Sequence, residues 1–160
     1  MEWQELRGEI VATTTRVGEL LRAVPTGDLP LARVDWSAAE TGAHLVSVAR
    51  RYRGMVRRSR RLPDSLAEDN RRALAEVPER DPGALADLLT SEVGVLLDVL
   101  GPDGDRPTWY FACPHTSAGL GAIMLTELLM HGLDLAQATG RPCPSPRTRP
   151  PRASTGSSPR

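Results

Sequence analysis

The sequence contains no lysine and few aromatic residues. All 20 basic residues are therefore arginines, which we attribute to compositional bias, and aromatic residues make up only 4% of the chain. Leu, Ala and Val supply most of the apolar mass, a mixture that suits helices rather than sheets. Because 160 residues are enough to bury a substantial core, the composition predicts one all-α domain.

Cysteine is also scarce, with only Cys113 and Cys143, and the two form no CxxC motif. This usage gives no sign of a disulfide framework and favours a reduced, cytoplasmic compartment. The N-terminal stretch MEWQELRGEI is acidic and amphipathic, which is not typical of a signal peptide. The longest apolar stretch, AGLGAIMLTELLM, is too short and too interrupted to span a bilayer, so we expect no membrane partner.

The zero net charge hides an uneven distribution along the chain. Residues 141–160 contain five arginines and no acidic residue, so residues 1–140 hold 15 basic against 20 acidic residues, a net charge of −5. A folded region of that charge is not typical of a general nucleic-acid-binding protein, and we expect no nucleic-acid partner.

Apolar residues recur at helical spacing along most of the chain. The pattern predicts an all-α four-helix bundle with long connecting loops. We expect its helices over residues 2–24, 37–60, 81–100 and 117–139, a short helical stretch at 66–76, and a loop with a short extended piece at 101–116.

Local signals support three of these helix starts. Ser37 with Glu40 three residues later forms a capping box, and Asp81 before Pro82 is a second cap. Thr116 or Ser117 caps the last helix, which ends at Gly140. After this helix the composition changes to Pro, Arg and Ser, so we expect a bundle over residues 1–143 and a disordered tail over 144–160.

A polar stripe runs along the last predicted helix. Glu127, His131 and Asp134 share one face of this helix and are flanked by apolar residues, so the stripe is expected to face inward. A Glu and a His four residues apart can both bind one metal ion, and His44, in the second long helix, is the candidate third ligand. Two alternatives stay open at this point: an exposed Glu–His pair, and a core histidine at His44.

Two motifs occur in order along the chain: Trp36-Ser37-x-x-Glu40 followed by Ala43-His44-Leu45, and then ExxxHGxDxAxATGRP from Glu127 to Pro142. Together they resemble the mycothiol-dependent maleylpyruvate isomerase family of DinB-like metal-binding bundles. The resemblance implies that His44, Glu127 and His131 bind a divalent metal, usually zinc, and that mycothiol, a small thiol, is the cofactor. It also implies thiol-assisted isomerisation of maleylpyruvate to fumarylpyruvate, or thiol S-transfer. A small thiol and a small electrophilic or carboxylate substrate are then the expected partners, and the oligomeric state, homodimer included, stays open.

Two further residues are candidates beside the metal ligands. The helical face of His44 continues to Arg51, which either belongs to a solvated arginine-rich face or lies near the mouth of the site, where it can contact a carboxylate or the cofactor. Asp134 follows His131 by three residues and is expected either as an outer partner of that ligand or in a packing role at the helix end.

The alternative to an enzyme is a truncated, non-catalytic metal-binding module. Characterised isomerases of the family carry a further C-terminal domain that helps form the thiol site, and the resemblance here stops after Cys143. On this reading the metal site forms but the chemistry is lost.

Overall fold

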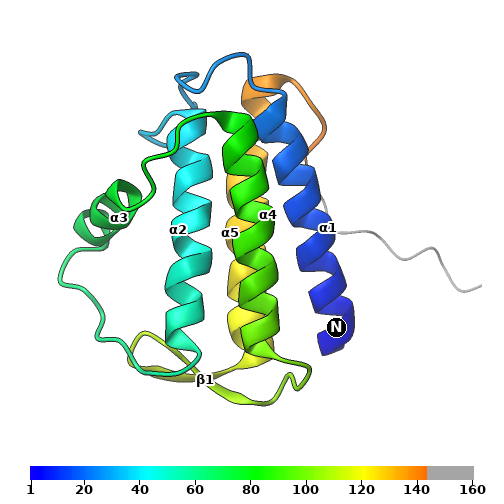
Figure 1. The fold of residues 1–160 in the computed structure, drawn as a ribbon, viewed down its shortest axis with the longest axis vertical. Coiled ribbons are helices and arrows are strands. Elements are labelled where there is room, and N and C mark those ends of the chain that lie inside the picture. Colours follow the sequence, from blue (N-terminus) through cyan, green and yellow to red (C-terminus); the bar gives the residue numbers. More distant parts are fainter. Residues whose placement is uncertain (144–160) are drawn as a thin grey trace, which may run out of the picture.

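Four long helices form a bundle in the computed structural model, which describes residues 1–143 (Figure 1). A short helix lies outside the bundle, and a two-stranded antiparallel hairpin crosses one end of it. The elements are α1 (Trp3–Arg22), α2 (Ala38–Met55), α3 (Leu66–Ala75), α4 (Pro82–Leu100), β1 (Pro107–Tyr110), β2 (Cys113–Thr116) and α5 (Ser117–Thr139). This confirms the predicted all-α bundle with long connections, while the tail expected over 144–160 lies outside the described residues.

The order of the helices around the bundle explains the long connections. α4 and α5 each pack against both α1 and α2, whereas α1 and α2 lie diagonally across the bundle. α2 and α4 run in the same direction, opposite to α1 and α5 (Figure 1). The chain must therefore return along the whole bundle between α2 and α4, and α3 forms on that return.

The predicted helix caps are present. Ser37 Oγ accepts a hydrogen bond from the Glu40 amide at 3.2 Å, and the Ser37 amide donates to Glu40 Oε2 at 2.8 Å. Asp81 and Thr116 accept from amides in the first turns of α4 and α5. Gly140 has φ 64°, the left-handed conformation that closes many helices and that glycine adopts at low cost.

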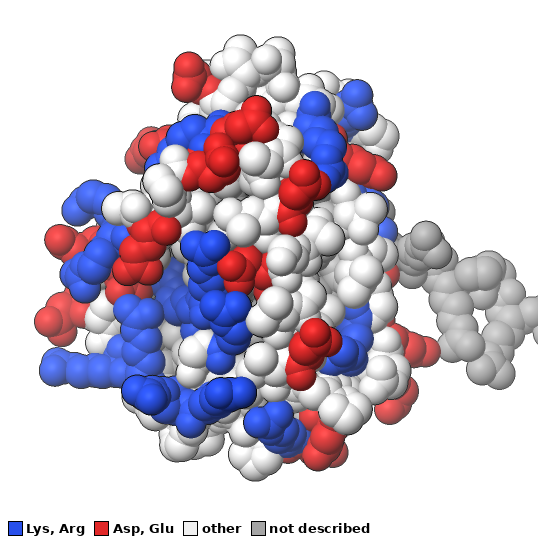
Figure 2. Space-filling model, viewed as in Figure 1, with Lys and Arg blue, Asp and Glu red and all other residues white. Residues whose placement is uncertain are grey.

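Arginines gather where α2 ends, which is visible as a group of blue side chains on the lower left of Figure 2. α2 was expected to continue to residue 60, but it ends at Met55. The chain leaves the helix because Ser59 Oγ and the Arg60 amide both donate to the carbonyl oxygen of Phe111, at 3.2 Å and 3.3 Å. The arginine-rich segment 57–61 is therefore hydrogen-bonded to the hairpin and does not continue the helix.

The connection before α5 is more regular than predicted. Residues 107–116 were expected to form a loop with one short extended piece, but β1 and β2 pair from Pro107–Thr116 to Tyr110–Cys113. The turn places Phe111 at φ 51°, a conformation that a bulky side chain rarely adopts. Burial of the Phe111 ring, which is 6% exposed, offsets part of that cost.

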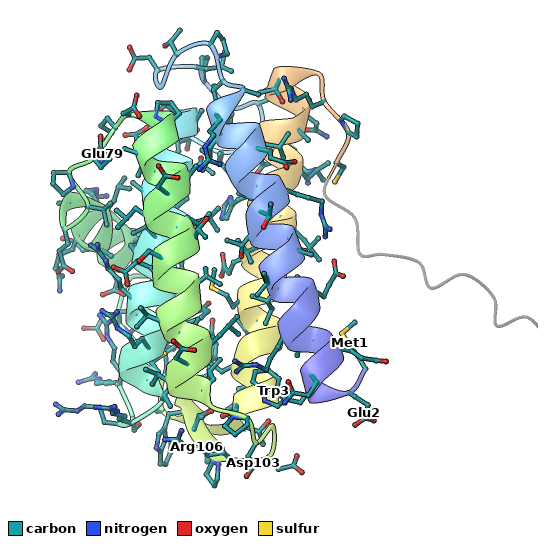
Figure 3. All side chains as sticks on the ribbon, turned by 45° about the vertical axis from the view of Figure 1, so that its right-hand side comes forward. Met1, Glu2, Trp3, Glu79, Asp103 and Arg106 are labelled. Carbon is teal, nitrogen blue, oxygen red and sulfur yellow. The ribbon has the colours of Figure 1, made fainter. Side chains whose placement is uncertain are left out.

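Trp3 closes the end of the bundle at which α1 begins. Its indole Nε1 donates to the carbonyl oxygen of Gly101 at 3.1 Å, and Figure 3 shows it beside the loop that carries Asp103 and Arg106. A Cβ on Gly121 would lie 2.8 Å from the Trp3 ring, so the close approach of α1 and α5 requires glycine at this position.

α5 is the longest helix within residues 1–143, and much of it is apolar. By length and composition alone it could cross a membrane, although half of its apolar window is buried inside the bundle. Buried core helices pass the same test, and α5 packs against both α1 and α2.

The capping box at the start of α2 gives the first testable prediction. Ser37→Ala removes the acceptor for the Glu40 amide, so we expect the free energy of unfolding to fall by about 1 kcal/mol. Urea unfolding of the metal-free protein measures this. Ser91→Ala, at an exposed position inside α4, is the matched control, and it should be neutral or slightly stabilising. Equal effects of the two substitutions would contradict the prediction.

Candidate metal centre

His44 on α2 faces Glu127 and His131 on the neighbouring helix α5. One ligand atom from each of the three side chains lies within 4.8 Å of the others. The two histidines are 4% and 6% exposed, and the Glu127 side chain is 25% exposed. The structure thus brings together the three residues that were predicted as ligands, and the polar stripe of α5 does face inward.

The distances within this cluster are longer than hydrogen bonds. Glu127 Oε2 is 3.8 Å from His44 Nε2 and 3.6 Å from His131 Nε2, and the two imidazole rings are nearly perpendicular. Four ligands at about 2.1 Å from a tetrahedral zinc ion would lie roughly 3.4 Å apart. Two nitrogen donors and one carboxylate oxygen therefore fit a shared cation better than they fit direct pairing.

The electrostatics of the cluster favour the protonation states that a metal needs. Burial lowers the pKa of the His44 imidazole below its ordinary value, and the nearby Glu127 offsets this only in part. Burial alone would raise the pKa of Glu127, but His131 and His44 outweigh it and hold that pKa well below its usual range. At neutral pH His44 keeps a free lone pair and Glu127 is ionised, as metal ligation requires.

Tyr52 is a part of the site that we did not predict. Its hydroxyl donates to Glu127 Oε1 at 3.2 Å, and burial, together with the charge of Glu127, raises the pKa of this hydroxyl. Tyr52 lies two turns after His44, so helical periodicity contained the signal. Its hydrogen bond occupies one carboxylate oxygen and leaves Oε2 directed between the histidines.

Trp36 also belongs to the site. Its ring lies against His44, with centroids 4.5 Å apart, and its centroid lies 6.0 Å from that of His131. The indole thus covers one side of the cluster and restricts the orientation of both imidazoles.

Asp134 contacts the far side of His131. Its Oδ2 lies 3.5 Å from His131 Nδ1, and its Oδ1 lies 3.8 Å from Arg33. His131 Nδ1 is buried and has no hydrogen-bond partner within residues 1–143, so this contact is a close approach rather than an aligned hydrogen bond. The position suits the outer partner that the spacing suggested.

The cluster opens into a cavity of about 270 Å³. Arg51, Asn70 and Tyr52 make one part of its wall polar, and the rest is aromatic or aliphatic. Besides these and the three clustered side chains, the lining comprises Val34, Trp36, Leu66, Tyr110 and Phe111. The connections between the long helices therefore contribute much of the wall, and sequence periodicity carries no signal for those residues.

Arg51 reaches the cavity in a restrained position. Its Nη1 donates to Asp69 at 2.9 Å, and both terminal nitrogens donate to Asn70 Oδ1 at 3.1 Å. The Arg51 side chain is 8% exposed, so it lines the wall as a fixed group rather than a mobile one.

Comparison with known families gives one match. The family model described as mycothiol maleylpyruvate isomerase N-terminal domain matches residues 6–136, which include the three clustered side chains. Searches of curated proteins and of solved structures returned no match.

The hydrogen bond from Tyr52 predicts an effect on metal affinity. Tyr52→Phe removes the donor that holds Glu127 Oε1, and we expect zinc to bind about tenfold more weakly, because partners of metal ligands have effects of this order. Competition with a chromophoric chelator measures the affinity.

Thr14→Val is the control for this substitution. It removes another buried hydroxyl, which donates to the Ile10 carbonyl oxygen at 2.8 Å. This hydroxyl is not part of the His44, Glu127 and His131 cluster. This change should alter stability but leave zinc affinity as in the wild type. Unchanged zinc affinity in Tyr52→Phe would show that Tyr52 does not position Glu127.

Proposed function

The chain belongs to the mycothiol maleylpyruvate isomerase N-terminal domain family, and on that premise we propose that it is a divalent-metal-binding, mycothiol-dependent enzyme. It acts as a thiol-assisted isomerase or as a thiol S-transferase. The observation that carries this proposal is the convergence of His44, Glu127 and His131 on one point at the wall of a cavity.

The donor set supports a catalytic metal rather than a structural one. His44, His131 and Glu127 would hold the ion with two imidazoles and one carboxylate, a three-ligand set that in zinc enzymes leaves one position for a ligand from solution. Zinc suits these donors and is the metal that we propose, while nickel, iron and manganese can bind the same ligand set. When bound, the cation would supply Lewis acidity that lowers the pKa of a thiol placed in the open position.

The reaction that we propose uses the cofactor thiol as a nucleophile. When bound, the thiol would supply a thiolate that adds reversibly to the activated double bond of the substrate, with the π electron pair taken up by the conjugated carbonyl. Because the bond between the former alkene carbons would then be single, rotation about it and loss of the thiolate would give the isomer. If the adduct is instead protonated at carbon and released, the outcome is S-transfer.

The walls of the cavity suit the two partners. Trp36, Tyr110 and Phe111 present apolar surface that excludes water from the metal face. Arg51 is our candidate for contact with a substrate carboxylate or with the cofactor, since it lines the same cavity and is already oriented by Asp69 and Asn70. We assign this activity to the bundle of residues 1–143 and place it in the cytoplasm, where a reduced thiol cofactor is available.

Metal content tests the ligand set. Purified wild-type protein dialysed against zinc should hold about one ion per chain, and His131→Ala should lose most of it, because removal of one of three ligands leaves a weak site. His115→Ala is the matched control, since this third histidine lies on β2 and does not line the cavity. Equal metal content in the wild type and His131→Ala would contradict the site.

Thiol binding and turnover test the activity. We expect mycothiol to bind zinc-loaded wild-type protein saturably in a calorimetric titration and to bind His131→Ala at least about tenfold more weakly. Absence of binding by the zinc-loaded wild type would overturn the proposal. Incubation with maleylpyruvate should then yield fumarylpyruvate or a thiol adduct, and binding without either product would favour the non-catalytic module.

A further inference from the structure

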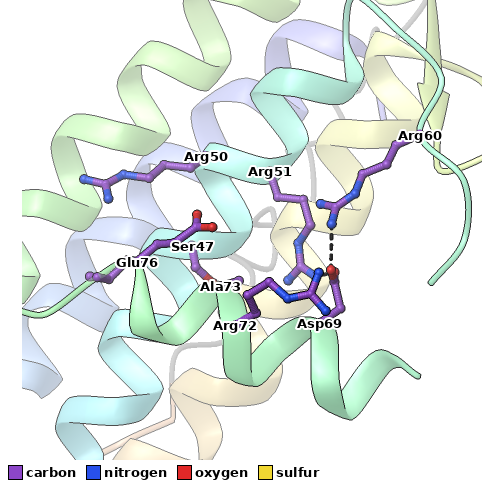
Figure 4. A pocket seen from close by; sticks show the side chains of 9 residues that line it. Ser47, Arg50, Arg51, Arg60, Asp69, Arg72, Ala73 and Glu76 are labelled. Atoms are coloured by element: carbon purple, nitrogen blue, oxygen red, sulfur yellow. Dashed lines mark hydrogen bonds and ion pairs between the residues drawn. The ribbon is translucent and has the colours of Figure 1, made fainter. Parts of the chain in front are cut away.

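A second cavity, of about 180 Å³, lies between α2 and α3 on the outer side of Arg51 (Figure 4). Four arginines line it, together with two acidic residues and a serine. The lining residues are Ser47, Arg50, Arg51, Arg60, Asp69, Arg72, Ala73, Glu76 and Val77. We propose that this cavity binds a small multivalent oxyanion, such as a phosphate group or a dicarboxylate. The metal site proposed above does not depend on the binding of an anion in this cavity.

The acidic residues at this cavity cannot balance its arginines. Asp69 is 4% exposed and is shared by two of them, Arg51 at 2.9 Å and Arg60 at 2.6 Å. One carboxylate thus faces two guanidinium groups. With Arg72 and Glu76 also counted, the lining keeps a formal excess of positive charge.

The ion pair of Arg50 does not remove this excess of positive charge, because its acidic partner is shared with another arginine. Its partner is Glu92 at 2.7 Å, and the same carboxylate also pairs with Arg53 at 3.0 Å. Arginine therefore outnumbers its acidic partners on both sides of α2. Such a concentration contrasts with the net charge of −5 over residues 1–140.

Arg72 is the donor that an incoming anion would meet. Figure 4 shows its side chain in front of Asp69 and beside Arg51, and no ion pair or hydrogen bond satisfies its guanidinium within residues 1–143. Arginines gathered around one point repel one another, and an oxyanion between them would offset that repulsion. Planar guanidinium groups also match the geometry of phosphate and carboxylate oxygens.

The position of Glu76 locates the anion within the cavity. Glu76 comes from the last residues of the α3 segment, and Figure 4 places it toward Arg50 and Ser47, away from Asp69 and Arg60. A second negative charge is unfavourable near this carboxylate. The oxyanion would therefore occupy the end bounded by Arg51, Arg60 and Arg72.

The size and setting of the cavity favour a small ligand over a macromolecule. A volume of about 180 Å³ admits a phosphate or a short dicarboxylate but no nucleic-acid strand. Its deepest arginine, Arg51, is 8% exposed and is held by Asp69 and Asn70, so the site is formed before the ligand arrives. Arg51 also lines the metal cavity, so the two cavities share this side chain as a wall.

Calorimetric titration of the whole chain with inorganic phosphate, and separately with malonate, tests the proposal at fixed low ionic strength. We expect one saturable site for at least one of the two anions. Arg72→Ala should weaken it about tenfold, as expected for loss of a charge-assisted hydrogen bond. Arg72 is exposed and makes no hydrogen bond or ion pair within residues 1–143, so this variant should fold, which circular dichroism checks.

Arg58→Ala is the matched control, because it removes the same charge from an exposed arginine that lines a neighbouring groove but not this cavity. It should leave anion binding within about twofold of the wild type, since exposed charges are strongly screened. Binding of phosphate alone or malonate alone would identify the ligand type. Absence of saturable binding of both anions, or equal losses in Arg72→Ala and Arg58→Ala, would overturn the proposal.

His131→Ala separates this site from the metal centre. It removes a proposed metal ligand but no residue of the arginine-lined cavity, so its anion affinity should match that of the wild type. Loss of anion binding in this variant would show that the anion binds at the metal centre instead, and it would overturn the second site.

Discussion

The Glu127 carboxylate lies between two buried histidines in the interior of a helical bundle, where an ionised group is costly unless cations or hydrogen bonds surround it. Tyr52 satisfies one of its oxygens, and the other faces His44 and His131 at distances that suit a shared cation. The remaining architecture has to keep α2 and α5 in the register that brings these side chains together.

The two long connections complete the site, because the bundle alone cannot enclose it. Since α2 and α4 run in the same direction, the returning chain lays α3 against α2, and Asn70 of α3 meets Arg51 there. The hairpin before α5 contributes the aromatic wall, and its Phe111 carbonyl accepts hydrogen bonds from the end of the α2–α3 connection. The same returning segment that forms part of the metal cavity wall thus also forms the arginine-lined cavity between α2 and α3.

Sequence reasoning succeeded where the physics is local and failed where distant segments meet. The starts of α2, α4 and α5 follow from capping side chains within three residues of each helix, and they were predicted correctly. The end of α2 was predicted five residues too late, because hydrogen bonds to Phe111, some 50 residues away, end it. Residues 107–116 lacked the turn residues that usually mark a hairpin, since Phe111 occupies the left-handed position.

The sequence by itself determined the starts of α2, α4 and α5 and the inward face of α5, since caps and periodicity depend on neighbours along one chain segment. It offered His44, Glu127 and His131 as candidate ligands through the two motifs and the family that they resemble. Only the tertiary structure decided that Tyr52 holds Glu127, that Trp36 covers the histidines and that Asp69 joins Arg51 to Arg60. These contacts depend on side-chain direction and on the path of the connections. Both are set by how the helices pack, and that is a property of the whole chain.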